Sequence, residues 1–355
     1  MWNSTVTQKL GIQFPIIQGP FGGRFSSVKL ASTISNLGGL GSFGLNAYGP
    51  EEILEVDRKM RSSTDKPYVL NLWVPLKNDP ANHYGPEDFE ALKPLFEKDF
   101  ARLNVPLPEA PPTAAPRFEA QAEALIEAAP PIASFIFGIP EPEIIRALKA
   151  KGTTVMATAT TLDEALAIEA AGIELVILSG MQAGGHRGAF INSPDVALNS
   201  THELLAAAKG QFKIPVIAAG GITTGADIAQ ALHFGAGAAQ LGTVFLATAA
   251  SNAPDEHKEK LFAPAYETEL TKVFTGRLAR VIRTPFSGAI SSEEEHKIAP
   301  FPIQSSFLGP LRKAAKAMGV ADYEAWWAGQ PTTTLKHRSA EALFNALKLE
   351  LEQAL

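Results

Sequence analysis

Short apolar runs that alternate with helix-like segments constrain this chain more than any other feature. Runs rich in β-branched and aromatic residues predict strands at 14–19, 39–45, 68–74, 133–138, 153–158, 175–179, 215–219 and 238–245. Segments with helical spacing lie between most of them, for example at 50–62, 141–151, 162–171 and 224–234. Eight such units in roughly 250 residues predict an α/β fold, a closed (β/α)8 TIM barrel rather than an open doubly wound sheet.

Two regions interrupt this repeat. Residues 76–131 are too many for one connection, and the prolines within 105–116 indicate a surface excursion. After about residue 252 the repeat ends, and helices are predicted at 308–318, 322–328 and 339–354. We therefore expect a barrel over 1–251. A smaller, mainly helical lid or second domain is expected over 252–355, with part of it available to complete the barrel.

Composition excludes several classes of function. The chain has no cysteine, which excludes disulfide scaffolds, zinc–thiolate sites and thiol enzymes. Its 31 Lys+Arg against 37 Asp+Glu give no basic surface for nucleic acid or an anionic membrane, so a small-molecule partner is expected. Its histidines lack metal-ligand spacing, and no metal is expected. Without a signal-peptide pattern or a long apolar span, the expected location is cytoplasmic.

The loop after the sixth predicted strand is the richest candidate for catalysis. Residues 179–188 contain four glycines and His186. Active sites of (β/α)8 barrels lie at the carboxyl ends of the strands, and histidine titrates near neutrality. The alternative is a histidine with a purely structural role. Its position in a glycine loop at a strand end favours proton transfer.

Glycines after the last two predicted strands indicate an anion site. Residues 218–224 and 240–243 carry Gly220, Gly221, Gly242 and Thr243. In this fold the corresponding loops commonly bind phosphate through backbone N–H groups, so the expected ligand carries a phosphate. Alternatively, these glycines only allow tight barrel packing.

Two further features point to a flat ligand at the barrel mouth. Residues 39–44 match G-x-G-x-x-G, but they lie within a predicted strand, whereas a dinucleotide fingerprint must follow a strand and open a helix. These glycines are instead expected to make room for a flat group. Asn71, at the end of the third predicted strand, offers an amide suited to the edge of a heterocycle.

With these motifs in this order, the chain resembles the nitronate monooxygenase family, FMN-dependent barrel enzymes formerly called 2-nitropropane dioxygenases. The resemblance covers nearly the whole chain and is carried by residues 15–23, 71–75, 183–188, 219–222, 240–243 and 327–330. It implies that His186 is the catalytic base. It also implies FMN contacts at Gly22, Asn71, Ser179, Gly184, Gly220, Gly221, Gln240, Leu241, Gly242 and Thr243.

The sequence departs from the family pattern at two of these positions. Phe21 stands where the family has methionine, and we expect this difference to change packing against the flavin and substrate preference. Ser179 stands where glutamine is frequent. Arg187 carries a charge suited to an anionic nitronate, but its adjacency to His186 in sequence does not assign it that role.

The activity implied by the resemblance is oxidative denitrification of alkyl nitronates, such as propionate 3-nitronate, and of nitroalkanes. Molecular oxygen is the oxidant, a carbonyl compound and nitrite are the products, and the protein is a monomer or homodimer. Two alternatives stay open at this point. One is a flavin-dependent enoyl-acyl-carrier-protein reductase using NADH or NADPH, and the other is a flavin-free barrel that binds a phosphorylated metabolite.

Overall fold

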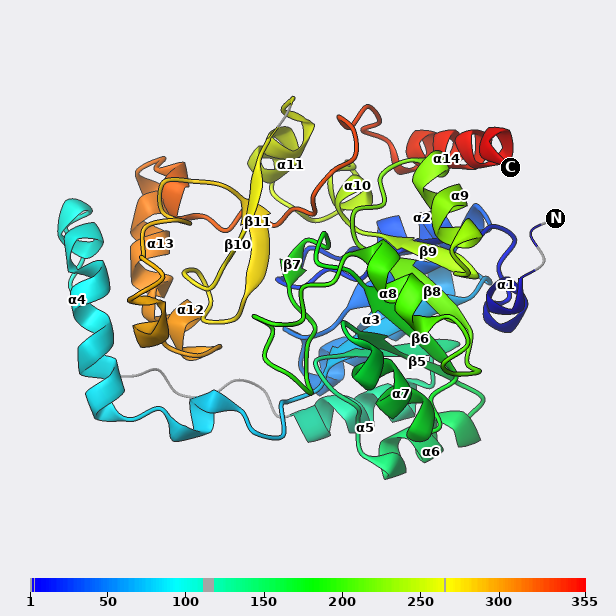
Figure 1. Cartoon of the computed structure of the whole chain (residues 1–355), viewed down its shortest axis with the longest axis horizontal. Helices are drawn as coiled ribbons and strands as arrows, with labels where there is room; N and C mark the ends of the chain where they lie inside the picture. The colour runs from blue at the N-terminus through cyan, green and yellow to red at the C-terminus, as the bar shows by residue number, and fades with distance from the viewer. Residues whose placement is uncertain (1, 3, 111–117, 265) are drawn as a thin grey trace.

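The computed structural model describes residues 2, 4–110, 118–264 and 266–355. Its central feature is an eight-stranded parallel sheet in the order β1-β9-β8-β6-β5-β4-β3-β2 (Figure 1). The strands are β1 (Ile16–Gln18), β2 (Gly41–Gly44), β3 (Tyr68–Trp73), β4 (Ile132–Ile136), β5 (Thr154–Ala159), β6 (Leu175–Ser179), β8 (Val216–Ala219) and β9 (Ala238–Leu241). A parallel bridge between Ile17 and Leu40 joins β1 to β2 and closes the ring. The predicted (β/α)8 barrel is therefore confirmed.

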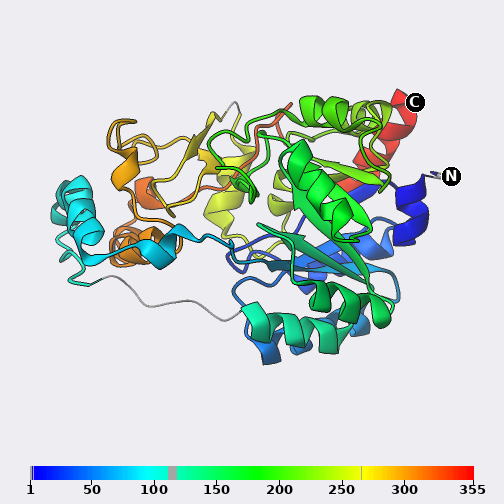
Figure 2. The ribbon, with the colours of Figure 1, turned by 60° about the horizontal axis from the view of Figure 1, so that its bottom comes forward.

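Helices surround this sheet (Figure 2). They are α2 (Val28–Asn36), α3 (Pro50–Ser63), α5 (Phe118–Ala128), α6 (Pro142–Ala150), α7 (Leu162–Ala170), α8 (Thr201–Ala208), α9 (Gly225–His233) and the short α10 (Thr243–Leu246). Side-chain caps begin several of them: Thr161 accepts from the backbone of Glu164, and Thr224 from that of Asp227. Strand side chains pointing inward fill the barrel, and α1 (Thr5–Leu10) contributes Val6 and Leu10 to this interior.

A second unit stands beside the carboxyl ends of the barrel strands. It contains a three-stranded sheet of β10 (Thr268–Thr271), β11 (Ala279–Ile282) and β7 (Gly185–His186). Helices α4 (Pro86–Arg102), α12 (Ile303–Phe307) and α13 (Gly309–Ala317) complete it, and Figure 1 shows α4 and α13 at the end opposite the chain termini. Phenylalanines of α4 pack against Phe274, Phe286 and Phe307 in one apolar cluster. The long excursion therefore supplies a helix to this second unit.

The last third of the chain contributes to both units. Helix α11 (Asp255–Phe262) precedes β10, and the terminal helix α14 (Ala340–Ala354) returns to the barrel, where its apolar face packs with residues of α2 and α9. A Cβ on Gly225 would lie 2.4 Å from the backbone nitrogen of Leu351, so this glycine permits the close approach of α14. Part of the proline-rich segment 105–116, residues 111–116, lies outside the described residues.

Two sequence expectations for the tail differ from the structure. A sheet forms within 268–282, where no strand was predicted. A helix at 322–328 was also predicted wrongly, because this part of the chain contains only the short 3-10 turn Ala321–Tyr323. The following backbone is extended and bonds to distant segments instead, as when the carbonyl of Trp326 accepts from the amide of Ile282. Two further 3-10 turns are Pro80–His83 and Glu295–Lys297.

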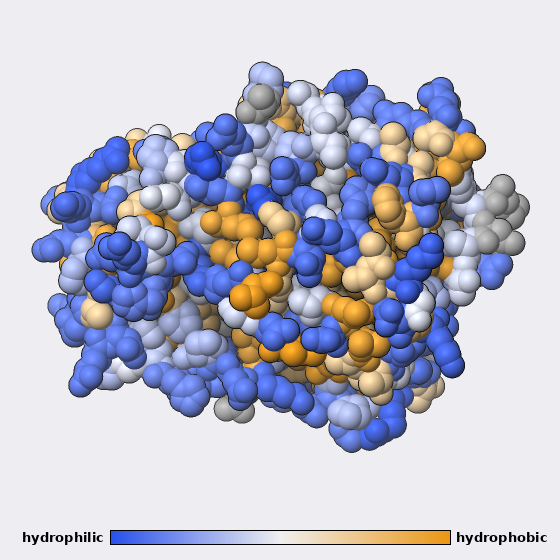
Figure 3. All heavy atoms as spheres, viewed as in Figure 1, coloured by the Kyte–Doolittle hydropathy of each residue, from blue (hydrophilic) through white to orange (hydrophobic). Residues whose placement is uncertain are grey.

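The surface is mainly hydrophilic, with apolar residues gathered near the centre of the face in Figure 3. Exposed apolar side chains on the loop between β7 and α8 include Ile191, Val196 and Leu198. Within the described part of the chain, no helix is long and apolar enough to cross a bilayer.

Candidate active site

The carboxyl ends of the barrel strands bring together residues that are distant in sequence. Asn71 pairs with Ser134 across β3 and β4, while Ala219 on β8 lies between Ser179 on β6 and Gln240 on β9. Three of the predicted flavin contacts, Asn71, Ser179 and Gln240, therefore share one rim. This rim faces the second unit.

His186 lies between this rim and the second unit. The short strand β7 pairs with β11, so that His186 lies opposite Ala279. The imidazole Nε2 is 2.9 Å from the hydroxyl oxygen of Thr275. Four aromatic rings have centroids 5.3–6.3 Å from the imidazole, those of Trp73, Phe137, Phe301 and Trp327. The second unit thus supplies both a hydrogen-bond partner and part of an aromatic enclosure.

This enclosure controls the charge of His186. Burial among apolar rings lowers its pKa to about 3, because the charged imidazolium loses hydration, and the positive Arg277 acts in the same direction. Arg277 stacks on Phe137, with its guanidinium carbon 4.2 Å from the ring centroid. The imidazole is therefore neutral near pH 7, the form that a proton acceptor requires.

We expect the His186 ring to remain neutral from about pH 5 to pH 8, unlike a free histidine with a pKa near 6.5. Because its pKa is lower in the folded chain, the unfolded chain takes up this proton first as the pH falls. The free energy of unfolding should therefore decrease as the pH falls from about 6.5 towards 3, with no contribution from this group above that window. Imidazole NMR, assigned by His186→Asn, measures the titration. A midpoint near pH 6.5 would contradict the expectation.

Arg187, next in sequence, points away from His186 into the protein. It is 1% exposed, and its guanidinium donates to the carbonyl oxygens of Ser179, Gly180 and Ala197. Burial lowers its pKa to about 10, which leaves it charged at neutral pH. Arg187 therefore fixes the loop after β6 from behind, and its guanidinium is not presented to a ligand beside His186.

A buried carboxylate, that of Glu164, binds the backbone just after the histidine loop. Glu164 is fully buried, and its oxygens accept from the backbone amides of Thr160, Phe190 and Ile191. The negative charge of Glu164 also favours the charged form of Arg187, because it raises the pKa of that guanidinium. No sequence pattern singled out this residue, because a glutamate in the first turn of α7 has the ordinary signature of a solvated helix start.

The glycine loops predicted to bind a phosphate, which we call the cradle, lie at the ends of β8 and β9. Gly220 and Gly221 have φ values of +103° and +72°, a region that favours glycine. A Cβ added to Gly242, just before α10, would meet nothing within 4 Å, so this glycine faces open space. Open space therefore lies beside Gly242, whereas a Cβ on Gly220 or Gly221 would lie 3.0 Å or 2.9 Å from the loop after β6.

A segment from the far end of the chain completes this cradle. In residues 326–332, which we call the strap, the amide of Gly329 donates to the Thr243 hydroxyl at 2.8 Å. The amide of Gln330 donates to the carbonyl of Gln182 at 2.9 Å. The strap therefore ties together the loops after β6 and β9. Its Trp-Ala-Gly-Gln motif contributed to the family resemblance, but sequence reasoning assigned its residues no role in the site.

Close packing against the strap explains why residue 184 is a glycine. A Cβ at Gly184 would lie 2.5 Å from the backbone nitrogen of Gly329 and 2.6 Å from the carbonyl carbon of Ala328. Two stretches of backbone touch here, and neither can move aside as a side-chain tip can. Packing alone therefore accounts for glycine at this position, in addition to the flavin contact expected from the resemblance.

We expect Gly184→Ala to lower the free energy of unfolding by about 1–3 kcal/mol, because the added methyl displaces the strap. Urea denaturation measures this change. Gly309→Ala is a matched control, since a Cβ there meets nothing within 4 Å. Equal stability of the two variants would show that the strap yields without strain.

Unpaired polar atoms on or just after the barrel strands test whether the residues present fit a flavin. The side-chain oxygens of Ser42, Asn46 and Gln240 are buried and lack a hydrogen-bond partner within the described chain. Such groups are destabilising unless a ligand or water satisfies them. Together with the open space at Gly242, they fit a phosphate-bearing heterocycle.

The other predicted flavin contacts occupy varied surroundings. The amide nitrogen of Asn71 donates to the Ser134 hydroxyl at 2.8 Å, which fixes its orientation. A Cβ on Gly22 would lie 2.9 Å from the Trp73 ring, so Gly22 makes room for that indole. Leu241 is 1% exposed and packs in the core with Phe21, so only its backbone is available to a ligand.

Sequence reasoning missed the residues that the second unit supplies. Thr275, Arg277 and Phe301 follow His186 by about ninety residues or more, in a region for which mainly helices were predicted. No short motif marks them, and only the pairing of β7 with β11 brings them to the site. Among the described residues, no cluster of three histidine, aspartate or glutamate side chains could hold a metal ion.

Known proteins share both the sequence and this architecture. Nitronate monooxygenase from Paraburkholderia phytofirmans is 37% identical over 351 residues, which cover 98% of this chain and 94% of that protein. The crystal structure of nitroalkane oxidase from Streptomyces ansochromogenes has a TM-score of 0.87 at 34% identity, covering 99% of both chains. FabK from Thermotoga maritima has a TM-score of 0.75 at 28% identity, covering 99% of this chain and 96% of that one.

The family model for nitronate monooxygenase matches residues 3–350. With the histidine loop, the paired glycine loops and the barrel in place, this match and the near full-length identity to the Paraburkholderia enzyme show that the chain belongs to the nitronate monooxygenase family of oxidoreductases.

Proposed function

We propose that this enzyme binds FMN and catalyses oxidative denitrification of alkyl nitronates, and of nitroalkanes after deprotonation. Molecular oxygen is the oxidant, and a carbonyl compound and nitrite are the products. The observation that carries this proposal is the position of His186, which aromatic rings enclose at the mouth of the barrel, beside the open space at Gly242. The family membership supports the reaction class.

FMN, when bound, would supply an acceptor for the electrons of the substrate and a donor of electrons to oxygen. Its phosphate would be held by the backbone of the loops that carry Gly220, Gly221, Gly242 and Thr243. Its ring edge would meet the unpaired oxygen of Gln240, with Asn71, Ser179, Gly22 and Gly184 nearby in the proposed site. Ser42 and Asn46 add two buried oxygens that sequence reasoning did not select.

His186 removes the α-proton when the substrate arrives as a neutral nitroalkane. The Thr275 hydroxyl is 3.3 Å from the carbonyl oxygen of Arg277, to which it donates. It can then accept from Nε2–H of His186, at 2.9 Å. We assign proton abstraction to Nδ1, which lacks a protein hydrogen bond within the described chain. A preformed nitronate needs no such step.

Positive charge around the loop favours an anionic substrate. Arg187, Arg277 and Arg280 surround residues 179–189, and no carboxylate forms an ion pair with any of them in the described chain. The charge of Asp79 acts on Arg277, and that of Glu164 acts on both Arg277 and Arg187. The excess of guanidinium groups raises the potential at the site and attracts a nitronate.

The test is an aerobic assay of nitrite release and oxygen uptake. Propionate 3-nitronate and the nitronate of 1-nitropropane are the substrates, and oxidation of NADH and NADPH is followed in parallel. We expect a yellow protein with nitrite release that does not depend on a nicotinamide. A protein that gains no flavin absorbance with added FMN would contradict the proposal. Bleaching by a nicotinamide without response to nitronates would favour the enoyl reductase alternative.

A further inference from the structure

The strap reaches two parts of the candidate site. At the cradle, the amide of Gly329 donates to the hydroxyl of Thr243 at 2.8 Å. Two residues earlier in the strap, the ring of Trp327 lies 5.3 Å from the His186 imidazole, measured between centroids. Because one short stretch of backbone carries both groups, a shift of this backbone at Trp327 would move both of them. Whatever fixes the backbone there also fixes part of the site.

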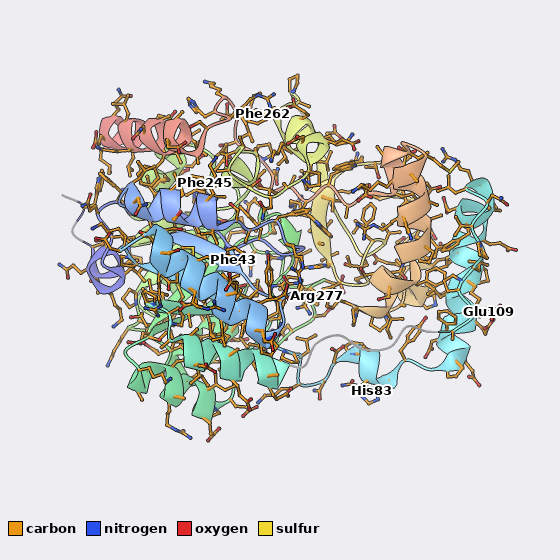
Figure 4. All side chains as sticks on the ribbon, turned by 180° about the vertical axis from the view of Figure 1, so that it is seen from behind. Phe43, His83, Glu109, Phe245, Phe262 and Arg277 are labelled. Carbon is orange, nitrogen blue, oxygen red and sulfur yellow. The ribbon has the colours of Figure 1, made fainter. Side chains whose placement is uncertain are left out.

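Helix α11 holds the strap and the segment after it at two points. The side chain of His257 donates from Nε2 to the carbonyl oxygen of Trp327 at 2.9 Å. The carboxylate of Glu259 accepts two hydrogen bonds from the guanidinium of Arg338, at 2.5 and 2.8 Å. This guanidinium also covers the ring of Phe262, the last residue of α11, which Figure 4 shows near the upper edge of the molecule.

The two contacts differ in burial. The side chains of Arg338 and Glu259 are 57% and 62% exposed, and an exposed ion pair contributes little because water competes with it. His257 is 1% exposed, and its ring packs edge to face against Phe25 and Trp326, at 5.6 and 5.5 Å between centroids. A hydrogen bond lost in such surroundings is not replaced by one to water. The bond from His257 is therefore the stronger contact.

The carbonyl acceptor fixes the form of the His257 ring. A carbonyl oxygen only accepts, so Nε2 carries a hydrogen. Burial lowers the pKa of His257, while its hydrogen bond to Trp327 and the charge of Glu324 act in the opposite direction, so the ring is neutral near pH 7. The amide nitrogen of glutamine is the same number of bonds from Cβ as this Nε2. Glutamine therefore reproduces the donor, and methionine reproduces the length without a donor.

The same imidazole also contacts the loop between β1 and α2. The amide of Phe25 in this loop donates to the carbonyl of Gly22 at 3.1 Å, and the carbonyl of Phe25 accepts from the amide of Asn252 at 2.9 Å. His257 therefore lies between the strap and the loop that carries Gly22, one of the expected flavin contacts.

We propose that His257 is a positioning residue, whose hydrogen bond to Trp327 holds the strap in place at the candidate site. This bond keeps Gly329 on the hydroxyl oxygen of Thr243 and keeps Trp327 beside His186. Because the Gly329 amide uses a lone pair of that hydroxyl, the hydroxyl hydrogen is left to donate to an anion at the cradle. The inference rests on the proposed function in one respect, that this anion is the phosphate of FMN.

The experiment compares His257→Met with His257→Gln. Hydrogen–deuterium exchange measures the strap amides of Gly329 and Gln330, and quenching of flavin fluorescence measures FMN affinity. In His257→Met we expect these amides to exchange about tenfold faster and FMN to bind about tenfold more weakly, because a hydrogen bond is lost in each case. His257→Gln should stay within about twofold of the parent in both quantities, since the donor is restored.

Controls separate this role from an effect on the whole fold. The amide of Ala218, in the barrel strand β8, reports global opening, and strap exchange is taken relative to it. His202→Met, at the exposed histidine on α8, should change neither strap exchange nor FMN affinity. If His257→Met does not fold, His257→Asn takes its place, because its amide is one bond shorter and does not reach the carbonyl.

The outcomes distinguish this inference from the proposed function. Equal strap exchange in His257→Met and His257→Gln would overturn the inference, because ring packing rather than the hydrogen bond would then fix the strap. A parent protein that binds no FMN would contradict the proposed function, whereas the strap exchange would still decide the role of His257.

Discussion

Replacing His186 with asparagine is expected to lower turnover of a neutral nitroalkane by about 10²–10⁴-fold, the usual contribution of a positioned general base. Asparagine keeps a polar side chain at this position but cannot accept the α-proton. The preformed nitronate of the same compound should be oxidised at a rate within a few-fold of the parent enzyme, since it needs no deprotonation. Paired assays of nitroethane and its nitronate measure the two rates.

The bound flavin and the fold provide the control for this prediction. His186→Asn should retain flavin absorbance, because the cradle at Gly220 and Gly242 is unaltered. His202→Asn, at an exposed histidine on α8, should leave both rates unchanged. Normal turnover of nitroethane by His186→Asn would remove His186 from its assigned role.

Replacing Gly242 with aspartate is expected to weaken FMN binding by about 10²–10³-fold. Two like charges about 4 Å apart repel by roughly 4 kcal/mol near a protein surface, and 1.4 kcal/mol corresponds to tenfold. Gly242 has a φ of −103°, which other residues adopt, and its Cβ position is open, so the backbone should accept the new side chain. Quenching of flavin fluorescence on titration into the flavin-free protein measures the affinity.

A matched charge placed elsewhere separates local repulsion from a general effect. Gly288 is exposed, its Cβ would also meet nothing within 4 Å, and it lies in the second unit. Gly288→Asp should therefore bind FMN as the parent protein does. Equal affinity of the Gly242→Asp variant and the parent would place the phosphate away from this loop.

The barrel could be predicted because its strands are local features. All except the glycine-rich β2 are short runs of mainly apolar residues, and each strand falls within or beside a range predicted from sequence. The second unit could not be predicted in this way. Strand β7 has only two residues and exists because β11 pairs with it, while α4 joins this unit through phenylalanines that contact residues about two hundred positions later.

The failed helix at 322–328 illustrates the same limit. Helical spacing was present, but the carbonyl of Trp326 accepts from the amide of Ile282. Just after this range, the amide of Gly329 donates to the Thr243 hydroxyl and that of Gln330 to the Gln182 carbonyl. Those bonds require an extended strap, and such tertiary contacts outweigh the small differences in helix propensity between residues.

The residues of the candidate site fall into the same two groups, those that a short segment of sequence identifies and those that depend on tertiary contacts. His186 and the glycines after β8 and β9 were identified from sequence, since a strand end followed by glycine is visible in one short segment. Thr275, Phe301 and the burial of Arg187 were not, because each depends on which segments fold against the loop after β6.

The sequence by itself therefore determined the barrel, the position of its histidine loop and the glycines after β8 and β9, because hydrophobic periodicity and glycine placement act over a few residues. Only the tertiary structure decided the charge state of His186 and the character of its walls. The walls are the rings of Trp73, Phe137, Phe301 and Trp327, which meet around the imidazole only after the barrel and the second unit have packed together. The charge state follows because burial among these rings removes water from the imidazole and lowers its pKa.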